Sequence, residues 1–237
     1  MHVPAGGGRA TAISIPRDAY VDLGPDLGEH KINSAWSRAA AQATEAMTGS
    51  GPSGSTSLFA AEANAPLSPD DPAVARAAAA AGARATVGAV EDLTGLRISH
   101  FAAVNLAGFA DVSSAIGGVP VCLRSPVEDS YSGLSLPAGP QQISGAQALA
   151  FVRQRHGLPA GDLDRIARQQ VFLAGATETL LSTGTLTDPF ALGRIASAVG
   201  RSVTLDAGWD VLGFARQMQG LSAGAVTFRT IPTGSTT

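Results

Sequence analysis

Residues 203–231 read VTLDAGWDVLGFARQMQGLSAGAVTFRTI. The short run Val203–Leu205 predicts a strand, residues 211–221 predict a helix, and residues 225–231 predict a second strand. Strands that alternate with helices are typical of α/β domains, in which helices cover the faces of a sheet. This segment therefore places the chain in the α/β class.

The same alternation extends toward the N-terminus. Strands are predicted at residues 12–15, 101–106 and 119–123, and helices at residues 34–47, 71–93, 109–116, 145–155, 162–182 and 190–199. Residues 48–57 predict a flexible loop, and the Pro/Ser/Gly-rich residues 124–143 predict an excursion over the surface. We expect residues 1–237 to form a single domain, a three-layer α/β/α sandwich around a mixed central sheet.

Composition narrows the function classes. Of 237 residues, 45% are hydrophobic and 15% are charged, which indicates a folded, well-buried chain. The net charge of −3 gives no overall electrostatic footprint for nucleic acid. Of the 16 basic residues only Lys31 is a lysine, and this skew, with the excess of alanine and glycine, points to a GC-rich genome such as those of actinobacteria. No run of 18 apolar residues is present, so any membrane anchor is expected outside these residues.

Arginine clusters at the predicted junction of two helices. Arg153, Arg155, Arg165 and Arg168 fall within 16 residues, in a segment that also holds Asp162. Guanidinium groups bind phosphate oxygens bidentately and stay charged when desolvated. The cluster therefore suits a pyrophosphate site with Asp162 as an orienter of the arginines, although a solvated, ion-paired helix surface is the ordinary alternative.

The predicted helix from residue 162 is amphipathic. Asp162, Arg165, Arg168 and Gln169 share one arc of about 120°, and Leu163, Ala167, Val171 and Ala174 share the opposite arc. We expect the apolar arc to pack and the arginine arc to be presented outward.

Two further segments carry candidate ligands. Arg17 and Asp18 directly follow the predicted strand at residues 12–15, where α/β folds commonly bind ligands. Lys31, in His30-Lys31-Ile32-Asn33, is a weaker candidate because a surface lysine is ordinary. A local ion pair between Arg17 and Asp18 is the alternative to a role in binding.

Taken in order, these segments resemble the LytR–CpsA–Psr family over about residues 11–182. The resemblance rests on the motifs Ser-Ile-Pro-Arg-Asp (14–18), Lys-Ile-Asn (31–33), Gly-Gly-Val (117–119) and the arginine segment 145–169. It implies a phosphotransferase that moves a glycopolymer from a polyprenyl-pyrophosphate carrier to peptidoglycan at the extracytoplasmic face of the membrane. Arabinogalactan is the first candidate polymer if the source is actinobacterial.

The resemblance also implies residue roles. Arg17, Arg153, Arg155, Asp162 and Arg165 are expected to act in catalysis around the pyrophosphate. Lys31, Arg168 and Gln169 are expected to bind the substrate.

The family's Mg²⁺ ligands are expected in strands that would lie upstream of Met1, because no Asp or Glu precedes Asp18. Asp18 is a weak substitute metal ligand. The sequence thus reads as an N-terminally truncated member whose membrane helix lies elsewhere, and we expect little or no catalysis from it. A non-catalytic lipid-pyrophosphate-binding module and, further back, a transcriptional regulator remain alternatives.

Overall fold

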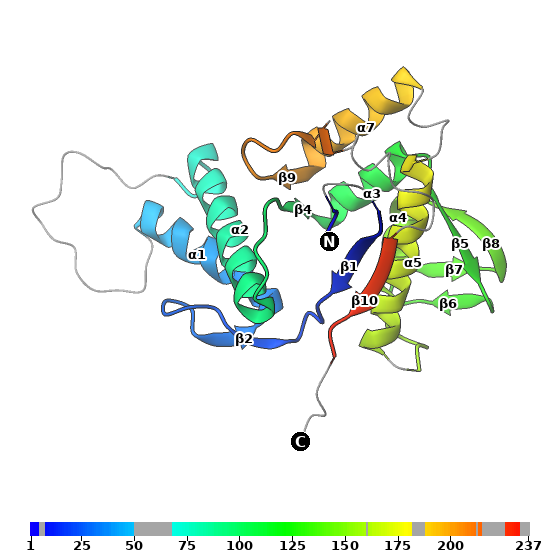
Figure 1. Cartoon of the computed structure of the whole chain (residues 1–237), viewed down its shortest axis with the longest axis horizontal. Helices are drawn as coiled ribbons and strands as arrows, with labels where there is room; N and C mark the ends of the chain where they lie inside the picture. Colours follow the sequence, from blue (N-terminus) through cyan, green and yellow to red (C-terminus); the bar gives the residue numbers. More distant parts are fainter. Residues whose placement is uncertain are drawn as a thin grey trace, which may run out of the picture. The chain divides into compact units, whose positions relative to one another are not determined.

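The computed structural model describes residues 1–4, 8–49, 68–159, 161–181, 188–211, 213–214 and 226–232. The chain divides into two compact units, Arg17–Phe101 and a second unit that joins Met1–Pro16 to Ala102–Thr237. Figure 1 labels most of the helices and strands of both units. The predicted loop at residues 48–57 lies outside the described residues beyond Gly49.

The unit Arg17–Phe101 consists of a hairpin and two long helices. Its elements are β2 (Tyr20–Asp22), β3 (Glu29–Lys31), the 3-10 helix η1 (Ile32–Ser34), α1 (Ala35–Thr48) and α2 (Pro72–Thr94). The strands β2 and β3 pair antiparallel. The helix α2 begins and ends where its sequence predicts: the Asp71 carboxylate accepts a hydrogen bond from the Ala73 amide at 2.7 Å, and Gly95 ends the helix in the left-handed conformation.

The second unit contains most of the strands. Its strands are β1 (Ala10–Ser14), β4 (Ala102–Val104), β5 (Val119–Leu123), β6 (Val127–Asp129), β7 (Leu134–Leu136), β8 (Gly139–Ile143), β9 (Val203–Leu205) and β10 (Val226–Thr230). Its helices are α3 (Leu106–Ala115), α4 (Gly145–Arg153), α5 (Asp162–Leu181) and α7 (Pro189–Ser202). The strand–helix–strand prediction for residues 203–231 is confirmed at both strands, and most of its helix lies outside the described residues.

Strand pairing is mixed, as the sequence predicts. β1 pairs parallel with β10, whereas β4–β9, β5–β8 and β6–β7 pair antiparallel. Together with β2–β3, the described strands form five two-stranded sheets, several short sheets in place of one wide one. The chain is therefore a mixed α/β protein.

The prediction that residues 124–143 make an excursion over the surface was wrong. β6, β7 and β8 lie in this segment, and Leu134, Leu136 and Ile143 are buried there. β6 and β7 are only three residues long, too short for an alternating pattern to stand out among the turn residues.

The core of this unit lies between β5–β8 and the helices α4 and α5. Along β5, Val119, Val121 and Leu123 are buried while Pro120 and Cys122 are exposed, so one face of the strand packs inward. Phe151 and Val152 of α4 and Phe172 of α5 join the same apolar cluster. This apolar cluster packs α4 and α5 onto the strands, and the end of α4 and the start of α5 contain the arginines of residues 153–168.

The contact between α5 and β5 depends on a glycine. A Cβ on Gly175 would lie 2.5 Å from the Pro120 carbonyl oxygen and 2.8 Å from Val119 Cγ1. We expect Gly175→Ala to lower the free energy of unfolding by about 1–3 kcal/mol, because the backbone of β5 must shift to admit the methyl group. Urea denaturation of the purified variant measures this loss.

Gly193 of α7 provides the matched control, because nothing lies within 4 Å of its Cβ position. Gly193→Ala should stabilise the protein by about 0.5–1 kcal/mol through helix propensity alone. If the two variants were equally stable, α5 would not pack on β5 as described.

Candidate phosphate-binding site

The arginine segment is built around the end of α4 and the start of α5. α4 buries Ala148, Phe151 and Val152, which leaves Arg153 exposed at its last turn. α4 ends at Arg153, and α5 begins at Asp162. Two acidic residues, Asp162 and Asp164, lie in the first turn of α5, where the helix dipole favours negative charge.

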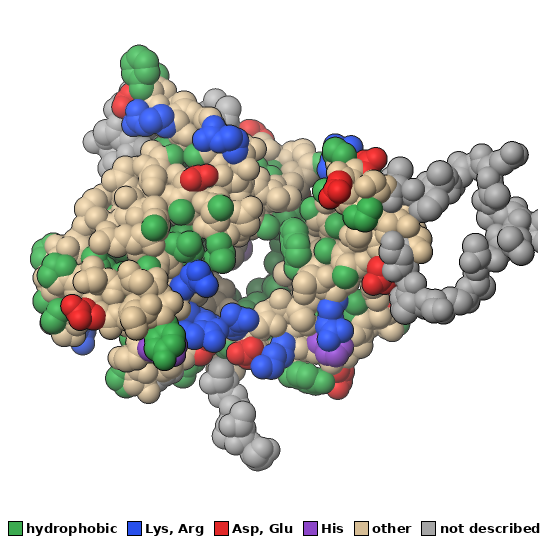
Figure 2. All heavy atoms as spheres, turned by 180° about the vertical axis from the view of Figure 1, so that it is seen from behind, with side chains coloured by type: hydrophobic (Ala, Val, Ile, Leu, Met, Phe, Trp, Pro, Cys, Tyr) green, Lys and Arg blue, Asp and Glu red, His purple; other side chains and the backbone are tan. Residues whose placement is uncertain are grey.

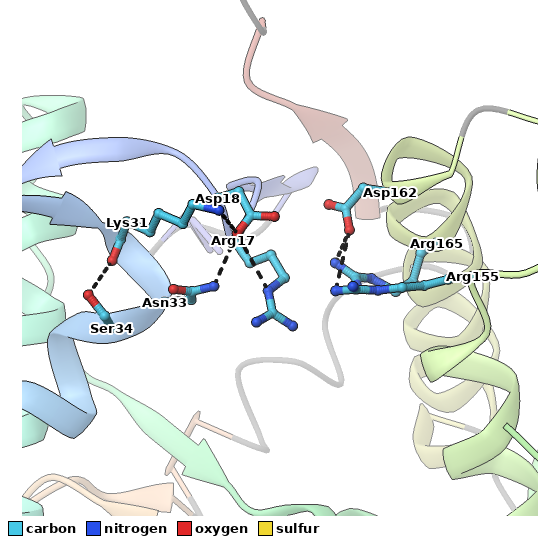
Figure 3. A network of polar contacts seen from close by, with 8 residues as sticks. All are labelled: Arg17, Asp18, Lys31, Asn33, Ser34, Arg155, Asp162 and Arg165. Carbon is cyan, nitrogen blue, oxygen red and sulfur yellow. Dashed lines mark hydrogen bonds and ion pairs between the residues drawn. The ribbon is translucent and has the colours of Figure 1, made fainter. Parts of the chain in front are cut away.

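Asp162 is the centre of an ion-paired group that also contains Arg155 and Arg165. Its Oδ1 pairs with Nη2 of Arg165, one helical turn later, and lies 3.9 Å from Nη2 of Arg155. Figure 3 shows both guanidinium groups directed at this carboxylate. The Arg165 side chain is 8% exposed, whereas those of Arg155 and Asp162 are 49% and 35% exposed. Asp162 therefore pairs with two arginines, of which Arg155 is the more accessible.

The faces of α5 are the reverse of the prediction. Leu163 and Val171, on the arc expected to pack, are 49% and 48% exposed, and Ala167 and Ala174 are exposed as well. Arg165, on the arc expected to be presented, is 6% exposed. The polar arc can be buried because Asp162 neutralises Arg165 within the same helix. Hydrophobic side chains also reach the surface at several places in Figure 2.

Arg168 and Gln169 of α5 both contact residues of α4. The guanidinium carbon of Arg168 lies 5.0 Å from the centroid of the Phe151 ring, a cation–π distance, and Gln169 Nε2 donates to the Val152 carbonyl at 3.2 Å. Burial lowers the pKa of Arg168 and the nearby Asp164 carboxylate opposes that shift, so the group stays cationic. Within the described part of the chain, Nη1 of Arg168 is buried without a hydrogen-bond partner. Gln169 thus has a structural contact, and Arg168 retains an unused donor.

Arg17, Asp18 and Lys31 form a separate group in the unit Arg17–Phe101. Asp18 Oδ1 lies 3.3 Å from Lys31 Nζ and 4.0 Å from Arg17 Nε, and it accepts a hydrogen bond from Asn33 Nδ2 at 3.3 Å (Figure 3). All three charged side chains are at least half exposed. The structure therefore brings Arg17 and Lys31 together around Asp18, and the weak candidate for a metal ligand is engaged with two cations.

The residues present do not by themselves fit a resident Mg²⁺ ion. Across the described ranges, no group of three or more His, Cys, Asp or Glu side chains is arranged to hold a metal. Mg²⁺ is held in proteins by one or two carboxylates together with phosphates and water. Asp18 and Asp162 each face cationic side chains, which compete with a metal ion for their oxygens.

A second polar cluster lies in the same unit as Asp162 and was not predicted from the sequence. Asp129, at the end of β6, accepts hydrogen bonds from the Tyr131 amide at 3.0 Å and from Ser132 Oγ at 2.8 Å. Nδ1 of His156 lies 3.9 Å from Asp129 Oδ1, and the His156 ring stacks on Tyr131 with 3.9 Å between centroids. The two segments are far apart in sequence and meet only through the fold, so no local pattern could have indicated this cluster.

The hydrogen bonds to Asp129 predict that the stability contributed by the turn at residues 129–132 is lost in acid. Burial raises the pKa of Asp129, but hydrogen bonds from Ser132 and Tyr131 and the nearby His156 outweigh burial and lower the pKa below 3.8. Because the pKa in the folded state is depressed, its stabilisation is present above the ordinary carboxyl pKa and is lost as pH falls through the lowered one. Asp129→Asn should remove this part of the pH dependence, as measured by urea denaturation at several pH values between about 7 and 2. Identical acid profiles for both proteins would contradict it.

Comparison with known proteins identifies the family. The model of the LytR_cpsA_psr family matches residues 1–237. The chain is 42% identical to cell wall biosynthesis protein LcpA of Corynebacterium glutamicum over 235 residues, 99% of this chain and 42% of that protein. It is 31% identical over 133 residues to the polyisoprenyl-teichoic acid–peptidoglycan teichoic acid transferase TagU of Bacillus subtilis, covering 55% of this chain and 42% of that protein. The chain thus belongs to the LytR–CpsA–Psr family and spans less than half the length of these relatives.

The fold agrees with solved structures. The LytR–Csp2A–Psr enzyme of Actinomyces oris matches with a TM-score of 0.67 and 23% identity, covering 95% of this chain and 72% of that chain. This match supports the mixed α/β fold. Of the helices that the structure describes, none is both long and apolar enough to cross a bilayer.

Proposed function

We propose that this chain transfers a glycopolymer from a polyprenyl-pyrophosphate carrier to a hydroxyl group of peptidoglycan. The observation that carries the proposal is the ion-paired group of Arg155, Asp162 and Arg165 at the junction of α4 and α5. Membership of the LytR–CpsA–Psr family supports it, as does the transferase named among the relatives. The accessible location of Arg155 favours a ligand that approaches from solvent.

The net charge of residues 153–168 is opposite in sign to that of a pyrophosphate diester. Arg153, Arg155, Arg165 and Arg168 supply four positive charges against two carboxylates, Asp162 and Asp164, which leaves a net charge of +2. A pyrophosphate diester carries two negative charges. Guanidinium groups that are already oriented by a carboxylate bind phosphate oxygens with little further loss of side-chain freedom. Asp162 is therefore proposed to hold the arginines in place, and Arg153 and Arg155 to contact the phosphates.

The proposed step is a phosphoryl transfer. The acceptor oxygen forms a bond to the phosphorus attached to the sugar, and the bond from that phosphorus to the oxygen of the polyprenyl phosphate breaks. The polyprenyl phosphate leaves with the electron pair, and the acceptor proton passes to a base. Fixed guanidinium groups stabilise the charge that develops on the phosphate oxygens.

Arg17 and Lys31 are proposed as phosphate ligands within their own unit, on the strength of the family resemblance. Asp18 would hold them as Asp162 holds Arg155 and Arg165, since it pairs with both. Gln169 is proposed to support the site through its hydrogen bond to Val152 rather than through direct contact with the substrate.

The finer features of the function are proposed on the same basis. The 42% identity to a Corynebacterium protein and the use of arginine in place of lysine favour an actinobacterial polymer, with arabinogalactan as the first candidate. The reaction would take place on the extracytoplasmic side of the membrane, where both substrates meet. Mg²⁺ dependence is proposed from the resemblance alone, and rates measured with Mg²⁺ and with a chelator test it.

A transfer assay tests the function. The protein is incubated with a synthetic polyprenyl-pyrophosphate-linked oligosaccharide and purified peptidoglycan, and the released polyprenyl phosphate is measured. Release should require the acceptor and should fall about tenfold or more in Arg155→Ala. Arg194→Ala, an exposed arginine of α7, is the matched control and should behave like the unaltered protein. Release that is independent of both acceptor and Arg155 would contradict the proposal.

A further inference from the structure

We infer that His156 is the general base that accepts the proton of the acceptor hydroxyl, and that Asp129 positions it. The inference rests on the proposed transfer reaction and supplies the base that this reaction lacks. His156 directly follows Arg155 in the chain, and the Arg155 guanidinium group faces Asp162.

Two contacts hold the His156 ring and a third holds its backbone. Its Nδ1 faces Asp129, its face stacks on Tyr131 with an interplanar angle of 21°, and its carbonyl oxygen accepts a hydrogen bond from Gln154 Nε2 at 2.9 Å. Gln154 is itself buried, so the backbone of the loop is fixed at this point. An imidazole that only covered the surface would not require such support.

The Asp129 side chain is buried, whereas the His156 side chain is accessible to solvent. The Asp129 side chain is 2% exposed and that of His156 is 59% exposed. A proton on Nδ1, facing the buried carboxylate, leaves Nε2 as a lone-pair acceptor. Within the described part of the chain, Nε2 has no hydrogen-bond partner of its own. This arrangement of a buried carboxylate behind an accessible imidazole is the one that orients a histidine base.

The two nearby carboxylates are poorer bases. Oδ1 of Asp162 already faces the guanidinium groups of Arg155 and Arg165, so this oxygen is engaged in ion pairs. Asp129 is nearly inaccessible and accepts several hydrogen bonds, so it can act only through His156. Among the described residues, the titratable and charged groups at His156 are Asp129, Tyr131 and the neighbouring Arg155.

In the proposed step, Nε2 of His156 takes the hydroxyl proton as the acceptor oxygen bonds to the sugar-linked phosphorus. The polyprenyl phosphate leaves with its electron pair, and the imidazolium then returns its proton to the leaving phosphate or to water. Asp129 stabilises the imidazolium while it exists. Proton transfer of this kind contributes about 10²–10⁴-fold to a rate.

The test measures binding and turnover separately. Unaltered protein and His156→Gln are compared in a titration with polyprenyl pyrophosphate and in the transfer assay, with His100→Gln, another exposed histidine, as the matched control. His156→Gln should lose about 100-fold or more in transfer rate while its lipid affinity changes by less than about twofold. Added imidazole should restore part of the activity of His156→Gly.

The pH profile tests the role of Asp129 as a positioning residue. The rate of the unaltered protein should fall on acidification, because a protonated imidazole cannot accept the hydroxyl proton. Asp129→Asn should shift this limb, and His156→Gln should abolish it. A transfer rate in His156→Gln within about threefold of the unaltered protein would overturn the inference, as would a loss of lipid affinity as large as the loss of rate. If the unaltered protein neither binds the lipid nor transfers, the proposed function fails and the base assignment falls with it.

Discussion

Replacing Arg165 with alanine is expected to weaken the binding of polyprenyl pyrophosphate by a factor of about 10 to 100. Two effects act in the same direction. The variant loses a positive charge from the segment, and Asp162 loses its main partner, so that a partly unpaired carboxylate repels the phosphates. Each charge-assisted contact is worth about 1.5–3 kcal/mol, which sets the expected range.

Titration with the lipid and thermal denaturation together test this expectation. Arg165→Lys should recover only part of the affinity, because an ammonium group cannot form the paired contacts of a guanidinium group. Arg194→Ala removes an exposed arginine from α7 of the same unit and should leave the affinity unchanged. Unchanged affinity in a folded Arg165→Ala protein would show that this segment does not bind the pyrophosphate.

Replacing Asp162 with asparagine is expected to destabilise the fold without abolishing transfer. The change removes the negative charge that Asp162 places against the Arg165 side chain, which is 8% exposed. A fully buried pair that loses one partner costs about 3–5 kcal/mol, and the 35% exposure of Asp162 reduces the expected loss to about 1–3 kcal/mol. Urea denaturation measures the loss, and Asp111→Asn, an exposed aspartate of α3, is the control.

The transfer assay on the same variant separates an orienting role from a basic one. An orienting Asp162 leaves a reduced but measurable rate, because asparagine keeps an oxygen that can accept from Arg155 and Arg165. Complete loss of transfer with lipid affinity and folding intact would instead assign the base role to Asp162 and remove it from His156.

Local signals predicted the elements better than the contacts between them. The start of α2 is predicted from Asp71 and Pro72, and its end from Gly95, because caps depend only on neighbouring residues. The faces of α5 could not be predicted in this way. Hydrophobicity alone favours packing of Leu163 and Val171, whereas the fold buries Arg165 because Asp162 supplies its opposite charge.

The ion-paired group of the site follows from local sequence, whereas the Asp129–His156 contact does not. Arg155, Asp162 and Arg165 lie close together in sequence, so a single helix and the turn before it suffice to bring them together. Asp129 is the last residue of β6 and His156 follows the end of α4, and no spacing rule predicts their contact.

The most direct test of the central claim is the fate of the phosphorus atom bound to the sugar. A carrier substrate labelled at that phosphorus is incubated with the protein and peptidoglycan, and the label is followed into both products. Phosphoryl transfer predicts that the label enters peptidoglycan with the glycan, in a one-to-one ratio with unlabelled polyprenyl phosphate. Label recovered on the polyprenyl product, with a glycan attached to peptidoglycan without phosphorus, would contradict the account.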